Sequence, residues 1–381
     1  MEPLNRIKSL LADRPAQLKH KKTQDKKIVG YIPGGYFPEE IALAAGAVPV
    51  GMVRGGEHSA VENAFACVDH WVDTFYRSQI GYATSGDDPY YNLIDVLVVP
   101  ITDSNNRTLS DTLSYYTDLE LFVYGVPHTK SKEGRDYFRH GLAKTADKIA
   151  GLTGIEITGQ RMTEAIDICN REKELLRELS QENQSGNTAL SPKDYVLVNQ
   201  ASMLLDKGQF IENLETLIRE LKAAKSGDNK KPKVLLTGST LALGDDKIID
   251  LLEEYGATVI TGEFAEGIKP FQHKVEPAED FMNALAETYF MERVAPAWFR
   301  PGHELPEHLI QTASATRVDG VVWYQLMYRE AYKILSHYFP EMLKKETGLP
   351  VLTLDSDYDP AETGQMATRI ETYIENIRRQ P

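Results

Sequence analysis

Residues 30–51 read GYIPGGYFPEEIALAAGAVPVG. The apolar residues before the first proline are typical of a strand, and Gly34 and Gly35 supply a turn in which other groups can approach the main chain. Pro38 stands where the first residue of a helix tolerates a missing N–H. The segment therefore predicts a strand, a glycine turn and a helix directed at an anionic ligand, with Gly34, Gly35 and Tyr36 binding substrate.

Apolar, strand-like runs recur in two blocks that are separated by a helical pattern. The runs cover residues 28–32, 48–53, 96–100 and 121–126 in the first block and residues 234–238, 257–261, 320–323 and 351–354 in the second. They predict the α/β class, with two doubly wound parallel-sheet (Rossmann-like) domains joined by a helical region. The predicted bounds are 1–157 for the N-terminal α/β domain with its basic helical lead, 158–228 for the helical connector, and 229–381 for the C-terminal α/β domain, with a linker composition at 228–232.

The chain has 381 residues, 42% of them hydrophobic, and a formal net charge of -14. Most of such a surface would repel a polyanion, so the composition argues against non-specific nucleic-acid binding. Two cysteines give no disulfide framework, and neither a signal-like N-terminus nor an apolar run of about 18 residues appears. We therefore expect a cytoplasmic protein that binds no nucleic acid and no membrane.

Further stretches follow the first in a characteristic order. Residues 95–107 read DVLVVPITDSNNR, a buried-type strand that runs into a polar loop, and residues 318–328 read VDGVVWYQLMY. Later, LDSDY at 354–358 precedes the helical pattern RIETYIE at 369–375. In order and spacing these stretches, together with residues 30–51, resemble the 2-hydroxyacyl-CoA dehydratase and benzoyl-CoA reductase family over nearly the whole chain.

The resemblance implies a radical reaction on a thioester. Members of that family work as heterodimers of related subunits that bind an acyl-CoA and receive a low-potential electron from an ATP-dependent iron–sulfur activator protein. The dehydratases form a ketyl radical that expels hydroxide, and the reductases dearomatise a ring. The resemblance therefore implies a homologous second subunit, acyl-CoA as substrate and a [4Fe–4S] cluster in the complex. The acyl group and the choice between reductase and dehydratase stay open.

The chain departs from the family pattern in sulfur, because iron–sulfur clusters need thiolate ligands and the chain has only Cys67 and Cys169. The family's cysteine positions fall on other side chains here, namely Asp73, Ile101 or Thr102, and Tyr328. Cys67 is the candidate metal ligand, as a displaced thiolate, or else a small buried residue. Cys169 lies in a helical core pattern. The main redox centre is therefore expected in the partner subunit.

The remaining candidate residues follow predicted strands, since ligands of open parallel sheets bind beyond the carboxyl ends of the strands, or lie close to them. Glu57 and His58 could exchange protons or form part of a solvated turn. Asp103 and Arg107 could hold a substrate carboxylate or form a surface salt bridge. The predicted catalytic residues are Glu57, His58 and Asp103, and the predicted substrate-binding residues outside the glycine turn are Arg54, Arg77, Arg107, Tyr324 and Tyr328.

Aromatic-rich stretches at 71–76 and 298–299 favour an interface with a partner subunit over simple packing. The leading hypothesis is a subunit of an ATP-activated, radical-type acyl-CoA reductase or 2-hydroxyacyl-CoA dehydratase complex that contributes substrate-pocket walls and an interface. The alternative is a noncatalytic acyl-CoA-binding or scaffold paralogue without redox chemistry. An unrelated nucleotide-dependent enzyme is disfavoured, because the sequence has neither a P-loop nor a dinucleotide-binding fingerprint.

Overall fold

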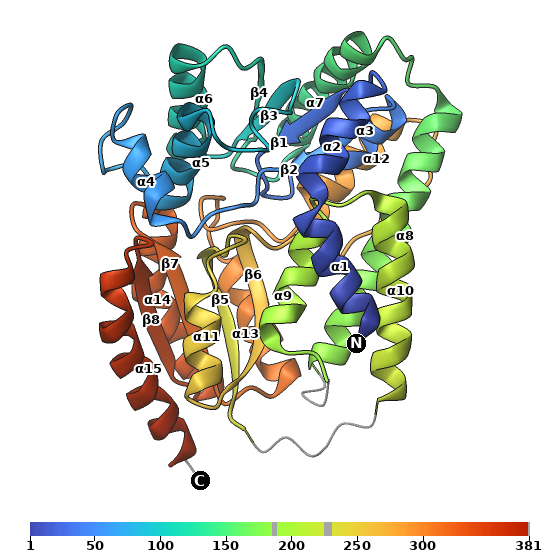
Figure 1. Cartoon of the computed structure of the whole chain (residues 1–381). Helices are drawn as coiled ribbons and strands as arrows, with labels where there is room; N and C mark the ends of the chain where they lie inside the picture. Colours follow the sequence, from blue (N-terminus) through green and yellow to red (C-terminus); the bar gives the residue numbers. More distant parts are fainter. Residues whose placement is uncertain (185–188, 225–230, 380–381) are drawn as a thin grey trace.

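Two sheets of four parallel strands form the framework of the chain in the computed structural model, which describes residues 1–184, 189–224 and 231–379. The N-terminal sheet has the order β2-β1-β3-β4, and the C-terminal sheet has the order β6-β5-β7-β8. Figure 1 shows the first sheet above the second. The strands are β1 (Ile28–Tyr31), β2 (Val48–Gly51), β3 (Val96–Ile101), β4 (Leu121–Gly125), β5 (Lys233–Thr240), β6 (Thr258–Glu266), β7 (Gly320–Leu326) and β8 (Val351–Ser356).

Helices cover both sheets, which confirms the predicted fold class of two doubly wound α/β halves. The N-terminal half contains α1 (Glu2–Ala12), α2 (Arg14–Thr23), α3 (Glu39–Ala44), α4 (His58–Ala64), α5 (Thr74–Ser85), α6 (Ser104–Tyr116) and α7 (Lys132–Thr153). The C-terminal half contains α11 (Lys247–Glu254), α12 (Phe281–Ala286), the π-helix η1 (Glu287–Glu292), α13 (Glu304–Thr316), α14 (Glu330–Thr347), the 3-10 helix η2 (Pro360–Glu362) and α15 (Thr363–Arg378). No helix within the described ranges is long and apolar enough to cross a lipid bilayer.

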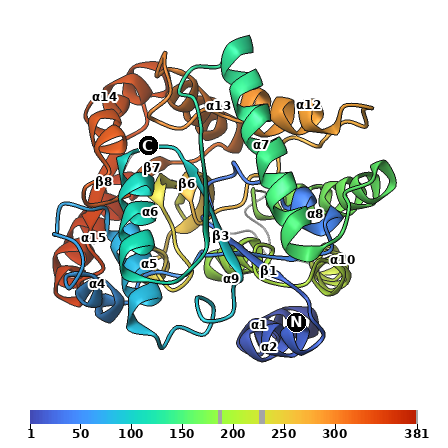
Figure 2. The same cartoon turned by 90° about the horizontal axis from the view of Figure 1, so that it is seen from above.

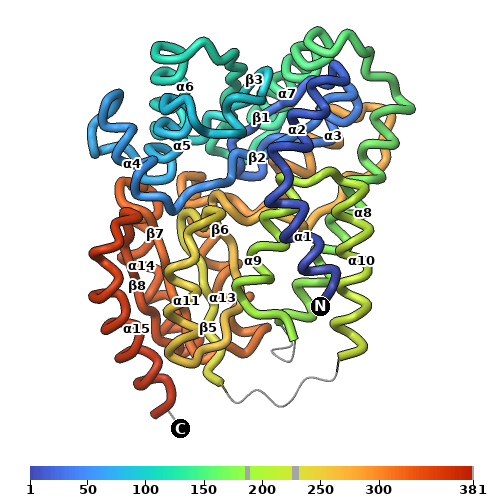
Figure 3. The backbone as a smooth tube through the Cα atoms, viewed as in Figure 1, coloured from blue at the N-terminus to red at the C-terminus, as the bar shows by residue number. Residues whose placement is uncertain are grey.

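Helices α8 (Gly159–Gln184), α9 (Pro192–Ala201) and α10 (Lys207–Ala223) lie in the segment predicted as a connector. The predicted boundary between residues 228 and 229 lies outside the described residues. The tube in Figure 3 shows the green connector running down beside the C-terminal half. Helix α1 contacts α10 and α9, so the basic helical lead packs against the connector, at the edge of the molecule seen in Figure 2.

The segment between β6 and α13 crosses from the C-terminal half to the N-terminal half. Helix α12 packs against α7, and Phe290 stacks on Phe138 with ring centroids 5.3 Å apart. Trp298 and Phe299 lie in the interior, at 6% and 2% exposure. The predicted interface role of these two aromatic residues is therefore wrong, because the crossing segment already buries them within the chain. Trp71, by contrast, is 65% exposed.

The loops that follow the strands of the two sheets meet at one seam between the halves. Arg54, after β2, forms a parallel bridge with Leu243, after β5. Across the same seam, the Tyr76 hydroxyl donates to Glu266 Oε1 at 3.0 Å. Ligands of open parallel sheets bind beyond the carboxyl ends of the strands, so the seam is the place to examine for function.

Candidate functional site

The predicted glycine turn follows β1 and faces the crossing segment. Gly34 and Gly35 have φ values of 152° and 73°, which disfavour any side chain. A Cβ on Gly35 would collide with the guanidinium of Arg293. Tyr36 points inward instead, with its ring 6.2 Å from that of Phe299, centroid to centroid, and burial raises its pKa to about 12. The turn thus lines a space beside Arg293, whereas the Tyr36 side chain belongs to the core.

The positions at which the sequence resemblance places the family's cysteines, Asp73, Ile101 or Thr102, and Tyr328, lie at the seam. Asp73 precedes α5, Thr102 follows β3 and Tyr328 follows β7. Two asparagines at the start of α6 connect them. The Asp73 N–H donates to Asn105 Oδ1 at 3.0 Å, and Asn105 Nδ2 donates to the Tyr328 carbonyl at 3.2 Å. Asn106 Nδ2 donates to Thr102 Oγ1 at 2.6 Å. Hydrogen-bonding groups therefore stand where the resemblance predicts thiolates.

A buried arginine lies at the centre of this region. Arg329 is 2% exposed, and its Nη2 donates to Glu266 Oε1 at 2.5 Å and lies 3.1 Å from Asp103 Oδ2. Its guanidinium carbon lies 5.0 Å from the Tyr76 ring centroid. Among the described residues its Nε and Nη1 have no hydrogen-bond partner. We call these groups the Arg329 network, which consists of Asp73, Tyr76, Asp103, Asn106, Glu266 and Arg329.

The Arg329 network contains a carboxyl group that titrates near neutrality. Burial raises the pKa of Asp73 to about 7, although Arg329 acts in the opposite direction. Burial likewise raises the pKa of Glu266. Asp73 Oδ1 caps α5 by accepting from the Phe75 and Tyr76 N–H groups, whereas its Oδ2 has no partner among the described residues. Asp73 thus has the pKa and the free oxygen of a proton-exchanging group.

We expect Asp73→Asn to reduce the pH dependence of stability. The pKa of Asp73 is raised on folding, so its contribution is fully present below the unfolded pKa and is lost as the pH rises through about 7. The variant should therefore be more stable than the wild type by about 1–2 kcal/mol at pH 5 and by up to about 4 kcal/mol at pH 8. Asparagine can still cap α5. Urea unfolding at both pH values measures this, and equal stability of the two proteins at pH 8 would contradict it.

A groove beside the Arg329 network leads to solvent. It has a volume of about 570 Å³, within the usual range of ligand sites, and runs between the end of β7 and α14. Tyr328 and Arg329 line it together with Leu326, Met327, Ile334 and His337. Tyr328 also contacts the exposed Trp71, with ring centroids 5.6 Å apart. We call this space the β7–α14 groove.

Other predicted site residues are engaged elsewhere. Arg77 is buried and bonds the Val72 carbonyl, Thr74 and Asp357, so it ties the two halves together. Arg54 pairs with Asp88 and Glu57 and lies over the Tyr82 ring. The remaining residues lie apart from the Arg329 network: half-buried His58 beside Glu62, exposed Arg107 paired with Asp111 of its own helix, and buried Tyr324 donating to Asp245. Of the predicted site residues, Asp103 belongs to the Arg329 network and Tyr328 precedes Arg329, with its ring centroid 5.8 Å from the Arg77 guanidinium carbon.

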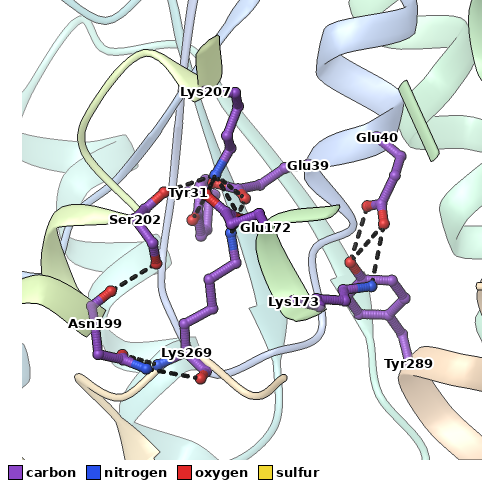
Figure 4. A network of polar contacts seen from close by, with 10 residues as sticks. All are labelled: Tyr31, Glu39, Glu40, Glu172, Lys173, Asn199, Ser202, Lys207, Lys269 and Tyr289. Atoms are coloured by element: carbon purple, nitrogen blue, oxygen red, sulfur yellow. Dashed lines mark hydrogen bonds and ion pairs between the residues drawn. The ribbon is translucent and has the colours of Figure 1, made fainter. Parts of the chain in front are cut away.

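A second buried network escaped the sequence analysis (Figure 4). Lys269 pairs with Glu39 and Glu172, and Lys207 Nζ lies 2.6 Å from Glu39 Oε2 and 2.8 Å from Glu172 Oε1. The Tyr31 hydroxyl donates to Glu39 Oε1 at 2.7 Å. Burial alone would raise the pKa of Glu39, but the two lysines lower it to about 2. These five residues form the Lys269 network, which joins the turn after β1, the connector and the segment after β6.

The residues at the seam do not fit a [4Fe–4S] cluster. None of the positions Asp73, Thr102 and Tyr328 offers a soft thiolate. Cys67 lies just after α4, half buried and packed against the core. Cys169 lies on α8, where burial raises the pKa of its thiol well above the usual value. Within residues 1–184, 189–224 and 231–379, no group of three histidine, cysteine or carboxylate side chains is arranged to hold a metal ion.

Comparison with known proteins identifies relatives along almost the full length. The profile of the family described as "2-hydroxyglutaryl-CoA dehydratase, D-component" matches residues 35–377. The Escherichia coli (strain K12) protein YjiM is 23% identical, over 90% of this chain and 89% of its own length. The (R)-phenyllactyl-CoA dehydratase beta subunit of Clostridium sporogenes is 20% identical, with 94% of both chains covered. The beta subunit of (R)-2-hydroxyglutaryl-CoA dehydratase from Acidaminococcus fermentans is also 20% identical, over 93% of this chain and 94% of its own length. The chain therefore belongs to the 2-hydroxyacyl-CoA dehydratase and benzoyl-CoA reductase family.

Proposed function

We propose that this chain is a subunit of an acyl-CoA dehydratase or reductase complex that contributes the substrate cleft and the contact surface for a homologous subunit. In this proposal the partner carries the [4Fe–4S] centre and receives the electron from an ATP-dependent activator in the cytoplasm. The observation that supports it is the convergence of Asp73, Thr102 and Tyr328 around Arg329, where the family's thiolates would stand. Family membership supports the acyl-CoA substrate.

The β7–α14 groove is the proposed place for the acyl thioester. Its volume suits a small-molecule ligand, and the buried guanidinium of Arg329 lies at its wall. A thioester oxygen that gains negative charge would be stabilised by such a buried donor. Asp73, with a pKa of about 7, would then exchange a proton with the substrate or with water. Asp103 positions Arg329 through their ion pair.

Iron analysis of the chain, alone and with a partner, tests the proposal. Prepared anaerobically without a partner, the chain should be colourless and hold neither iron nor acid-labile sulfide. Coexpressed with a homologous subunit, it should yield a brown complex. Cys67→Ala should leave the iron content, the acyl-CoA affinity and the turnover of the complex unchanged, because Cys67 only packs against the core.

Each alternative has a distinct result. Iron in the isolated chain that disappears in Cys67→Ala would establish the displaced-ligand hypothesis and overturn the proposal. A chain that binds acyl-CoA but leaves turnover unaffected in every reconstituted complex would be the noncatalytic paralogue. An Arg329→Lys variant adds a readout of the substrate site, since it keeps the charge but changes the geometry of the donors. It should raise the acyl-CoA dissociation constant of the isolated chain at least about tenfold.

A further inference from the structure

Arg293 is a buried cation without a counter-ion. It follows η1 in the crossing segment and is 6% exposed. Its Nε and Nη1 have no hydrogen-bond partner, and it takes part in no ion pair, among the residues that the structure describes. Its guanidinium carbon lies 4.8 Å from the ring centroid of Tyr36. An unpaired charge in the interior costs several kcal/mol, so this arginine is expected to face an anion that completes its contacts.

A small cavity adjoins this guanidinium. It has a volume of about 50 Å³, which is room for roughly three or four water-sized groups. Gly34 and Gly35 form one side, and Phe37, Pro270 and Tyr289 add apolar surface. His273, which is exposed, also lines the cavity and marks its opening to solvent. We call this space the Arg293 pocket.

The other charges around the Arg293 pocket balance one another. Lys269 and Lys207 pair with Glu39 and Glu172. Lys173 directly follows Glu172 on α8. Its Nζ lies 3.3 Å from Glu40 Oε1, and the Tyr289 hydroxyl donates to the same carboxylate at 2.8–2.9 Å (Figure 4). Arg293 is therefore the excess positive charge of this wall. One monoanion in the pocket would neutralise it.

We propose that the Arg293 pocket binds a small carboxylate of acetate to propionate size, either as a free acid or as the end of a short acyl chain. The carboxylate oxygens accept from the Arg293 guanidinium, and the alkyl carbons contact Phe37 and Pro270. A phosphate is disfavoured, because the apolar walls offer it few donors and Glu39 repels a second negative charge. The assignment rests on the geometry of the pocket alone and holds whether or not the chain works in a dehydratase complex.

Calorimetric titration of the full chain with propionate, at constant ionic strength, tests the assignment. Wild type should bind propionate with a dissociation constant on the order of 1 mM, and should not bind propionamide, which has the same shape without the charge. Arg293→Met should weaken propionate binding at least about tenfold, while Arg293→Lys retains part of it. Arg6→Met is the matched control, because Arg6 is exposed on α1, and it should bind propionate as wild type does.

The stability to urea provides a second readout, in case weak propionate binding by Arg293→Met could be attributed to poor folding of the variant. Without ligand, Arg293→Met should unfold at the same or a higher urea concentration than wild type, because it removes an unpaired buried charge. Propionate should then shift the urea midpoint of wild type only.

A comparison of succinyl-CoA with butyryl-CoA distinguishes the two possible ligands, a free acid and the carboxylate end of an acyl chain. An Arg293-dependent preference for succinyl-CoA identifies an acyl terminus, and equal affinities identify a free acid. If neither propionate nor succinyl-CoA binding depends on Arg293, or if propionamide binds as well as propionate, the assignment is wrong.

Discussion

Arg329→Met is expected to lower the free energy of unfolding by about 3–5 kcal/mol at pH 7, the usual range for breaking a buried ion pair from one side. Arg329 lies between Glu266 and Asp103, with Asp73 close enough to feel its charge. Methionine fills similar space but leaves these carboxyl groups buried with no cation among them. In the proposed complex the same change should also abolish turnover, since the groove loses its guanidinium donors.

The pH dependence of the loss separates electrostatics from packing. In the variant, the buried carboxyl groups cost less free energy when they are protonated. The loss in the free energy of unfolding relative to wild type should therefore grow as the pH rises from 5 to 8. Adding Glu266→Gln to Arg329→Met should restore part of the stability. Arg107→Met is the control, because exposed Arg107 pairs only with Asp111 and should cost less than about 1 kcal/mol. A deficit that is constant with pH and unaffected by Glu266→Gln would show that only packing had been lost. Denaturant unfolding at several pH values measures each of these outcomes.

The strands were predictable because each carries its own signal. A strand of a parallel sheet is buried on both faces, so residues 96–101 or 320–326 read as nearly continuous apolar runs. The glycine turn after β1 was predictable for a related reason, since the positive φ values of Gly34 and Gly35 strongly favour glycine. The crossing segment after β6 was not predictable. Its aromatic residues resemble an exposed interface in sequence, but in the fold Phe299 is buried against Tyr36 and His128 of the N-terminal half.

The sequence predicted which strand ends contribute to the candidate site, but it did not predict which side chains at those ends belong to it. The rule about carboxyl ends identified Asp103 and Tyr328, which do lie at the seam. It also selected Arg107, which lies one helical turn beyond Asp103 on the exposed face of α6. Arg329 was not selected although it directly follows Tyr328, and Glu266, the last residue of β6, lies beyond the run 257–261 that was predicted as a strand. Sequence spacing does not say which side chain at a strand end turns towards the other half.

The Lys269 network could not be predicted from the spacing of residues in the sequence, for a different reason. Glu39, Glu172 and Lys269 lie far apart in the chain and meet only when the two halves and the connector are packed together. Taken singly, each reads as an ordinary solvent-exposed charge, whereas in the structure Glu172 is fully buried. A charge that is costly to bury persists here because its partners are supplied by three different parts of the fold.

Lys269→Met should therefore destabilise the chain about as strongly as the loss of Arg329, by about 3–5 kcal/mol in denaturant unfolding at pH 7. The variant leaves Glu39 and Glu172 buried with Lys207 as their shared cation. Adding Glu172→Gln restores a one-to-one pair between Glu39 and Lys207, so the double variant should recover part of the loss.

The neighbouring pair of Lys274 and Glu174 supplies the matched control. It joins the same two segments, α8 and the chain after β6, with Nζ and Oε1 2.8 Å apart, but its side chains are 39% and 40% exposed. Lys274→Met should consequently cost less than about 1 kcal/mol. The two lysines differ mainly in burial, so a large loss for Lys269 and a small one for Lys274 would assign the stabilisation to pairing of desolvated charges. Equal losses would mean that any link between these segments is sufficient, and the buried network would then have no special part in holding the halves together.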